Sequence, residues 1–141
     1  MPLSITKPTV GGSSNTWGTE VNAALDAIKS FVDTLETGLG KYVGVNAQTG
    51  TTYTPVLADA GKLVTLSNAA AITVTLPSDA TVALAIGTVI DFAGIGVGLV
   101  TFSAGSGATR NPSPAATRAQ YSVASAIKTA ANTWLVVGDL A

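Results

Sequence analysis

Residues 72–77 read Ile72-Thr73-Val74-Thr75-Leu76-Pro77, a strict alternation of apolar and threonine side chains that ends at a proline. Alternation with a period of two puts one set of side chains on a buried face and the other on a solvated face, as in a half-buried β-strand. The same period recurs along the chain after Tyr53. It predicts strands at 53–58, 62–67, 72–76, 88–93, 99–104, 121–129 and 133–138.

Turn-forming residues separate these strands, for example Asp59-Ala60-Gly61, Pro77-Ser78-Asp79 and Gly105-Ser106-Gly107. Seven short strands at this spacing are typical of an antiparallel β-sandwich or β-barrel. We therefore expect a mainly β protein whose residues 53–141 form a small antiparallel β-sandwich or barrel.

Residues 19–37 have helical spacing instead. Their apolar side chains lie three or four positions apart, as do positions a and d of a coiled coil: Val21, Leu25, Ile28, Val32 and Leu35. With Val21 at d, the residues at a and d favour three or more helices over a parallel dimer. We expect this amphipathic helix to be the oligomerising element. The alternative is that it packs on its own β-domain.

The segments on either side of the helix show neither period. Residues 1–18 contain two prolines and a glycine pair, which favour an extended arm. Because such an arm has no core, we expect Ile5, Val10 and Trp17 to dock on a neighbouring protein. Residues 38–52, rich in glycine and small polar side chains, are expected to form a linker.

The composition argues against most enzymes. The 141 residues include no Cys and no His, which removes disulfide scaffolds, thiol nucleophiles, Cys/His zinc sites and His-based triads. A net charge of −1 provides no electrostatic basis for binding nucleic acid or an anionic membrane. We expect no enzymatic activity, no cofactor and no metal.

The surface must carry unusually few charges. Charged residues make up 11 % of the chain and hydrophobic residues 47 %, whereas soluble domains average about 25 % charged. We expect part of this surface to be covered by copies of the chain or by another protein. The alternative is a small β-domain that is simply rich in threonine.

The apolar stretch 83–100 contains Asp91 and several glycines, which predicts buried strands rather than a membrane span. Its glycine run, Gly94-Ile95-Gly96-Val97-Gly98, departs from the G-x-G-x-x-G nucleotide fingerprint and leads into a strand. We therefore expect a hairpin with a close backbone approach there, not a phosphate-binding loop.

Aspartates are the remaining acid–base candidates in the β part. Glycosidase chemistry needs two carboxyl groups facing each other across a cleft, and the scattered Asp59, Asp79 and Asp139 are expected to bond their own backbone in turns. Asp91 is interpreted as an outward-facing strand position. The alternatives are a cation site on an axis or a pair with Lys62, Lys128 or Arg118.

Two stretches are similar to proteins of tailed bacteriophages. Residues 6–28, which run through Thr6-Lys7-Pro8-Thr9-Val10-Gly11-Gly12 and Trp17-Gly18-Thr19-Glu20-Val21-Asn22, resemble the N-terminal segment of phage fibre and appendage proteins. In the β part, Ala58-Asp59-Ala60-Gly61-Lys62-Leu63-Val64 and Thr133-Trp134-Leu135-Val136-Val137-Gly138-Asp139-Leu140 look like the small Thr/Gly-rich domain of phage structural proteins. The resemblance implies a non-enzymatic virion component, commonly a trimer, anchored by its N-terminal segment.

We therefore expect a homotrimer on the virion surface, bound to a capsid or tail protein. A single β-domain without a long shaft favours a capsid decoration or cement protein or a short head fibre. The alternative is a tail-fibre or adaptor protein whose β-domain attaches to a host glycan. No partner among nucleic acids or membranes is expected.

Overall fold

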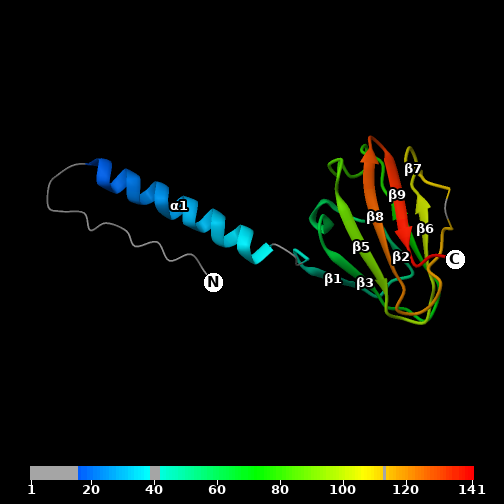
Figure 1. Cartoon of the computed structure of the whole chain (residues 1–141). Coiled ribbons are helices and arrows are strands. Elements are labelled where there is room, and N and C mark those ends of the chain that lie inside the picture. Colours follow the sequence, from blue (N-terminus) through cyan, green and yellow to red (C-terminus); the bar gives the residue numbers. More distant parts are fainter. Residues whose placement is uncertain (1–15, 39–41, 113) are drawn as a thin grey trace. The chain divides into compact units, whose positions relative to one another are not determined.

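In the computed structural model of the chain, the described residues are 16–38, 42–112 and 114–141, with side chains of the helix described over 21–33 (Figure 1). The chain divides into two compact units, Met1–Lys41 and Tyr42–Ala141. The first contains the helix α1 (Thr16–Gly38) and the second a β-domain. The predicted helix and the mainly β class are confirmed, while residues 1–15 of the predicted arm lie outside the described residues.

The described part of the β-domain contains nine strands and one short 3-10 helix, η1 (Leu57–Asp59). The strands are β1 (Val45–Gln48), β2 (Thr52–Tyr53), β3 (Leu63–Leu66), β4 (Ile72–Leu76), β5 (Val89–Gly94), β6 (Val100–Ala104), β7 (Thr109–Arg110), β8 (Val123–Ala130) and β9 (Thr133–Gly138).

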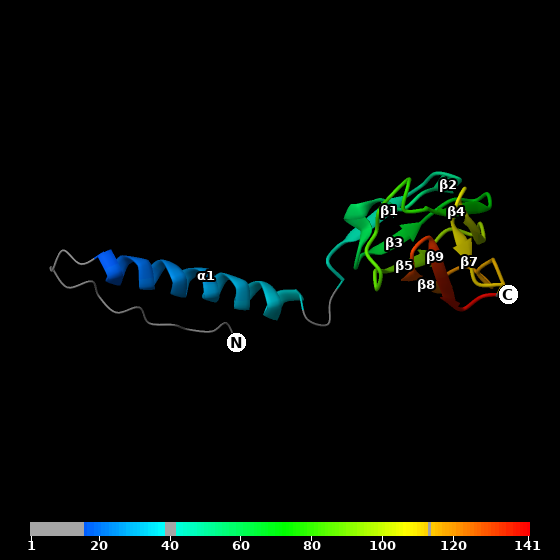
Figure 2. The ribbon, with the colours of Figure 1, turned by 90° about the horizontal axis from the view of Figure 1, so that it is seen from above.

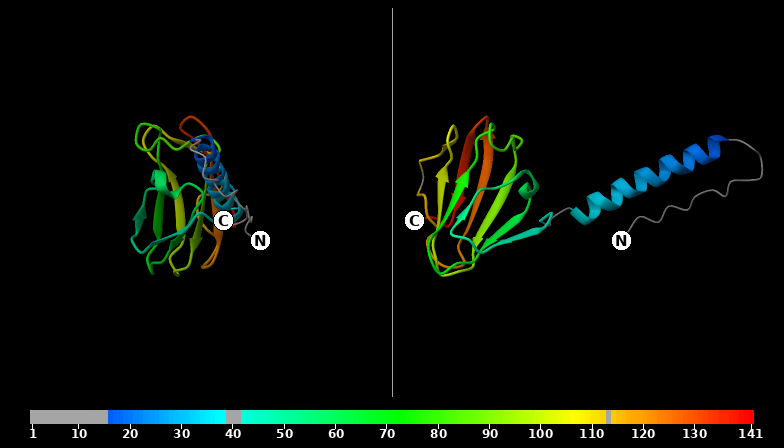
Figure 3. Two further views of the ribbon diagram at one scale, coloured as in Figure 1. Left: turned by 90° about the vertical axis from the view of Figure 1, so that its left-hand side faces the viewer. Right: turned by 180° about the vertical axis from the view of Figure 1, so that it is seen from behind.

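The strands form two sheets (Figure 2). Sheet A has the order β1-β3-β5-β8-β9-β7, and sheet B has the order β2-β4-β6. Up to β6, successive strands therefore alternate between the sheets. The views in Figure 3 show the strands of both sheets running along roughly the same direction.

The predicted antiparallel arrangement is wrong for most of the domain. Five strand pairs are parallel: β1–β3, β3–β5, β2–β4, β4–β6 and β7–β9. The antiparallel pairs are β5–β8 and β8–β9. The reason is that each short connection leads to the other sheet, so that a strand returns to its own sheet in the same direction as before. A two-residue period is common to parallel and antiparallel strands and does not distinguish them.

Several strand bounds agree with the sequence prediction, and β4 and β9 coincide with predicted ranges. The structure differs from the prediction in segment 38–52. This segment was expected to be a linker, but it contains β1 and the first residue of β2. In β1 the apolar Val45 and Ala47 are exposed and the polar Asn46 and Gln48 are less exposed, so its alternation is the reverse of that in the core strands.

Buried apolar side chains of both sheets form one core. At its centre the rings of Phe92 on β5 and Phe102 on β6 meet edge to face, with centroids 5.4 Å apart. The other members are Val64, Leu66, Ile72, Val74, Leu76, Leu84, Ile90, Val100, Ala124, Ala126, Trp134 and Val136. Because these residues alternate with exposed ones along each strand, the period seen in the sequence locates the core.

Short corners that carry the chain from one sheet to the other stack on one another. The amide of Gly98 donates to the carbonyl oxygen of Asn68 over 2.9 Å. The side-chain amide of Asn68 in turn donates to the carbonyl oxygen of Thr49 over 2.7 Å. The corner after β5 is thus bonded to the corner after β3, which is bonded to the corner after β1.

Glycine makes this stacking possible. A Cβ on Gly98 would lie 1.9 Å from the carbonyl oxygen of Ala70, and one on Gly96 would lie 2.4 Å from the backbone of Asn68. The close backbone approach expected at 94–98 is confirmed, but the segment joins two sheets and does not close a hairpin.

The apolar stretch 83–100 is divided between β5, a corner and the start of β6, as the sequence predicts. Among the described residues, no helix combines the length and the apolar character needed to span a membrane.

Gly98→Ala should destabilise the β-domain strongly, because backbone atoms would have to move to admit the methyl group. We expect a loss of about 1–3 kcal/mol or more in the free energy of unfolding, measured by urea denaturation. Gly44→Ala is the matched control, since its Cβ would meet the Lys62 side chain at an ordinary 3.7 Å. Equal stabilities of the two variants would contradict the stacked-corner interpretation.

Candidate functional site

The candidate oligomerisation surface lies on α1. The helical backbone brings Val21, Leu25, Ile28 and Val32 to one side, because residues three and four apart are neighbours on a helix. Val21 and Ile28 are 44 % and 55 % exposed, and Leu25 and Val32 are partly exposed. Leu35 lies in α1, but its side chain is outside the described residues. We refer to Val21, Leu25, Ile28 and Val32 as the α1 seam.

Phe31 extends this surface and was missed by the sequence analysis. Its side chain is 64 % exposed, and it directly precedes Val32 of the seam. It escaped notice because it falls outside the a and d positions. The sequence does contain a signal for it, because Phe31 is a large aromatic residue one position from the seam. The same heptad position seven residues earlier holds the small Ala24.

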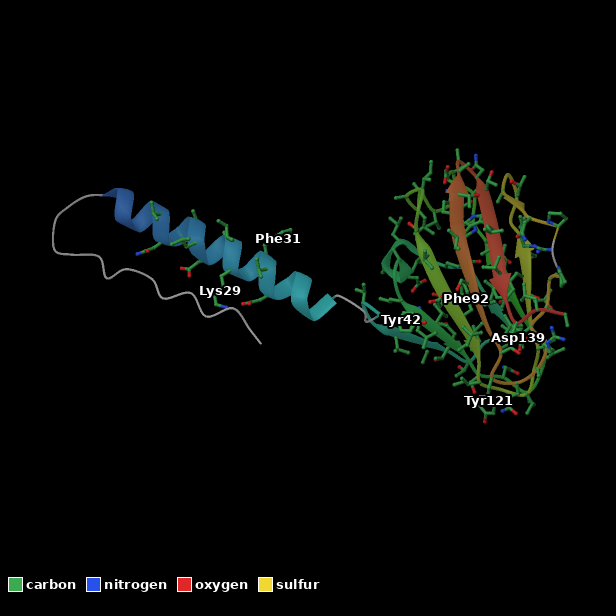
Figure 4. The ribbon with its side chains drawn as sticks, in the orientation of Figure 1. Lys29, Phe31, Tyr42, Phe92, Tyr121 and Asp139 are labelled. Atoms are coloured by element: carbon green, nitrogen blue, oxygen red, sulfur yellow. The ribbon has the colours of Figure 1, made fainter. Side chains whose placement is uncertain are left out.

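A polar pair borders the α1 seam on the flank away from Phe31, because Lys29 lies four residues after Leu25 and three before Val32. The ammonium group of Lys29 lies 2.6 Å from a carboxylate oxygen of Asp33, one helical turn further on. Figure 4 shows Phe31 and Lys29 projecting from different sides of the helix. An i,i+4 pair of this kind contributes little to stability, roughly 0.3–0.5 kcal/mol, so its main effect is to keep this flank of α1 hydrated beside the apolar seam.

Of the three predicted docking residues, the structure describes the backbone of Trp17 alone. Ile5 and Val10 lie outside the described residues. Trp17 lies in α1, which begins at Thr16, and not in an extended arm as predicted. The helix therefore begins before Val21, the first residue of the seam. The side chain of Trp17 is outside the described residues.

A polar cluster with the buried Asp59 at its centre lies on the less exposed side of β1 and β2. Asp59 is 1 % exposed, and its carboxylate accepts hydrogen bonds from the Tyr53 hydroxyl (2.5 Å), the Asn46 side-chain amide (2.8 Å) and the Val56 amide (2.9 Å). The side-chain amide of Gln48 donates to Asn46 over 2.7 Å. We call Asn46, Gln48, Tyr53 and Asp59 the polar end cluster.

The ionisation of this cluster follows from its bonds. Burial acts to raise the pKa of Asp59, but the hydrogen bonds from Tyr53, Val56 and Asn46, with the nearby Lys62 charge, outweigh it and hold the pKa below its ordinary 3.8. Burial and the bond to Asp59 raise the pKa of Tyr53. Asp59 is therefore a satisfied anion, and it bonds β1 and β2 as well as its own turn.

A second buried polar group joins the loop after β4 to the β8–β9 hairpin. Lys128 is fully buried, pairs with Asp79, and places its ammonium group 5.6 Å from the Trp134 ring centroid. The hydrogen bond from Lys128 lowers the pKa of Asp79. Asp79 also exchanges hydrogen bonds with Asn132. The carboxylate of Asp79 is thus bonded by partners about fifty residues away and not, as was predicted, by the backbone of its own turn.

Two further aspartates have partners on neighbouring segments. Asp139 accepts hydrogen bonds from Ser122 (2.6 Å) and Arg118 (2.7 Å), which lower its pKa. Asp91 faces outward on β5, as interpreted from the sequence, and accepts a hydrogen bond from Ser125 of β8.

The geometry of these aspartates is that of structural hydrogen-bond acceptors. Each of them is engaged by hydroxyl, amide or cationic donors of the same chain. Within the described ranges, no group of three or more His, Cys, Asp or Glu side chains is arranged to hold a metal ion. Among the described residues, the α1 seam is an apolar surface that no contact within the chain accounts for.

Comparison with known proteins finds no family model that matches the chain and no matching curated protein.

Asp59→Asn should destabilise the β-domain by about 1–3 kcal/mol at neutral pH, because one acceptor oxygen becomes an amide facing donors. The depressed pKa of Asp59 means that its contribution is complete above pH 3.8 and is lost as the pH falls through the lower folded-state pKa. The difference between the parent chain and the variant should therefore shrink in acid, as thermal unfolding at pH 7 and at pH 2–3 would reveal. Tyr53→Phe, which removes a single donor, should have a smaller effect. A difference that does not change with pH would show that Asp59 is not ionised in the fold.

Proposed function

We propose that this protein is a non-enzymatic structural protein of a bacteriophage particle, and that three copies assemble through α1. It would serve as a capsid decoration or cement protein or a short head fibre, bound to a capsid or tail protein through its N-terminal segment. The observation that carries the proposal is the exposed α1 seam, an apolar surface with coiled-coil spacing on a helix that forms a unit separate from the β-domain.

The energetics of α1 support self-association. In proteins most helical stability comes from packing an apolar side of the helix and not from intrinsic helix propensity. Full burial of a Val, Leu, Ile or Phe side chain contributes roughly 1.5–3 kcal/mol. Burying the seam and Phe31 between copies would therefore offset the entropy lost on association.

The particle location rests on the resemblance of residues 6–28 to the N-terminal segment of phage fibre and appendage proteins. The charge-poor composition is consistent with a surface that other subunits cover. The mechanism is mass action: contacts made only in the assembled particle stabilise it against dissociation.

For the β-domain, a two-layer β-sandwich is supported over a closed barrel. Among the described strands, β1 and β2 each pair with a single neighbour. A closed barrel has no such edges.

Attachment to a host glycan is a second candidate function, and Tyr121 is the observation in its favour. Tyr121 is 71 % exposed, and its φ of 66° is uncommon for a residue other than glycine. By contrast, Trp134 is buried, and Tyr53 is bonded to Asp59. If the candidate is right, the full chain binds glycans on an array and Tyr121→Ala abolishes the signal. Equal signals from both proteins would exclude Tyr121 as the contact.

Ile28→Asp should convert the assembled protein into monomers, since a carboxylate in an apolar seam has no compensating partner. Sedimentation equilibrium of the full chain should give the mass of three 14.0 kDa chains for the parent protein and of one chain for the variant. Ala23→Asp places the same charge at an exposed position away from the seam and should leave the trimer intact. A monomeric parent protein, or an Ile28→Asp variant that remains trimeric, would refute assembly through α1.

A further inference from the structure

The two sheets of the β-domain have outer faces of opposite character. On sheet B, the outward strand positions alternate with buried core residues and carry hydroxyl side chains: Thr52, Thr73, Thr75, Thr101 and Ser103. The hydroxyls of Thr75 and Ser103 are 3.5 Å apart across the paired strands. Such a face is suited to contact with water.

The outward positions of sheet A are mostly apolar. The strand register places Val89, Ile127 and Leu135 in one row across β5, β8 and β9, and Val45 next to Leu63 on β1 and β3. Val123 and Val137 also lie on this side. We call these seven residues the outer face of sheet A. Val45 is 64 % exposed, and Val89, Val123 and Val137 are each about 40 % exposed.

Strand propensity does not account for this contrast. Valine and threonine are both β-branched and fit a strand equally well. The difference between the faces is hydration, since a hydroxyl favours water whereas an apolar side chain favours burial. Strands that are apolar on both sides are typical of sheets covered on both faces.

The outer face of sheet A also carries little charge, which suits it to an uncharged contact. Among the strand residues of β1, β3, β5, β8 and β9, all within the described part, Asp91 is the outward-facing ionisable side chain. It accepts a hydrogen bond from Ser125 of the same sheet. It is also a hydrogen-bond partner of Tyr42, whose pKa is raised chiefly by that bond. Asp91 thus has partners within its own chain, and the face needs no cation from outside.

A second copy of the chain is the occupant that the proposed assembly provides. Three residues, 39–41, separate α1 from the β-domain. If α1 assembles, the β-domains are tethered at an effective concentration in the millimolar range. At that concentration a modest apolar contact is sufficient to hold two faces together.

We propose that the outer face of sheet A is the contact between the β-domains of associated copies, while the hydroxyl face of sheet B remains in water. The proposal rests on assembly through α1. It adds a second interface, made by a different part of the chain.

The chain has no cysteine, so one introduced thiol reports on one position. Val137→Cys and Val89→Cys place a thiol on the outer face of sheet A, and Thr73→Cys places the matched control on sheet B. Each full-length variant is alkylated with iodoacetamide at a concentration where sedimentation gives the assembled mass. The measurement is repeated with Ile28→Asp added. Thermal unfolding checks that each variant is folded.

The thiols on sheet A should react about tenfold more slowly than the Thr73→Cys thiol, because reactivity requires access of the reagent. Adding Ile28→Asp should remove the difference. An assembled protein whose sheet A thiols react as fast as the control would overturn the proposal and leave assembly through α1 intact. Slow reaction in an Ile28→Asp variant that sediments as a monomer would mean that the same chain covers the face, which also overturns the proposal. A monomeric parent protein would refute both proposals.

Discussion

The stacking of backbone on backbone at the corners of the β-domain is the constraint on which its other features depend. Neighbouring strands in a sheet are about 4.8 Å apart, so the corners that link successive strands must approach equally closely. Gly96 and Gly98 meet this requirement against Asn68 and Ala70. Because β3–β5 and β4–β6 pair on either side of these corners, a wider corner would separate strands in both sheets. The shared core and the distinct outer faces follow from this arrangement.

Local periodicity was sufficient to predict most strands, since each alternates buried and exposed residues; the bounds of β4 and β9 were predicted in full. Strand direction was not predictable, because alternation is identical in parallel and antiparallel pairs and a short glycine-rich link resembles a hairpin. β1 was assigned to the linker because glycines and small polar residues surround it, and the fold places Asn46 and Gln48 at its inward positions. Its inward side belongs to a polar cluster that only the folded chain brings together.

The candidate surface on α1 was predicted from heptad spacing, which identified its seam but not Phe31 beside it. The partners of the aspartates were less accessible to prediction. Asp79 bonds Lys128 and Asn132, which are distant in the chain, and no local pattern encodes such a contact. The sequence was therefore sufficient to locate the amphipathic helix, whereas only the fold distinguishes a hydroxyl-covered sheet from an apolar one.

The polar end cluster has a consequence for how far the winding of the chain can extend. A parallel two-sheet winding presents an open end at β1 and β2 whose edges could accept another turn, from the same protein or from a foreign strand. Stacking a further apolar turn there would remove the water that still reaches the partly exposed side chains of Asn46, Gln48 and Tyr53. The cluster thus acts as a terminator, comparable to the capping repeat of a solenoid. A domain end of this kind opposes the end-to-end pairing of folded domains that an apolar end would permit.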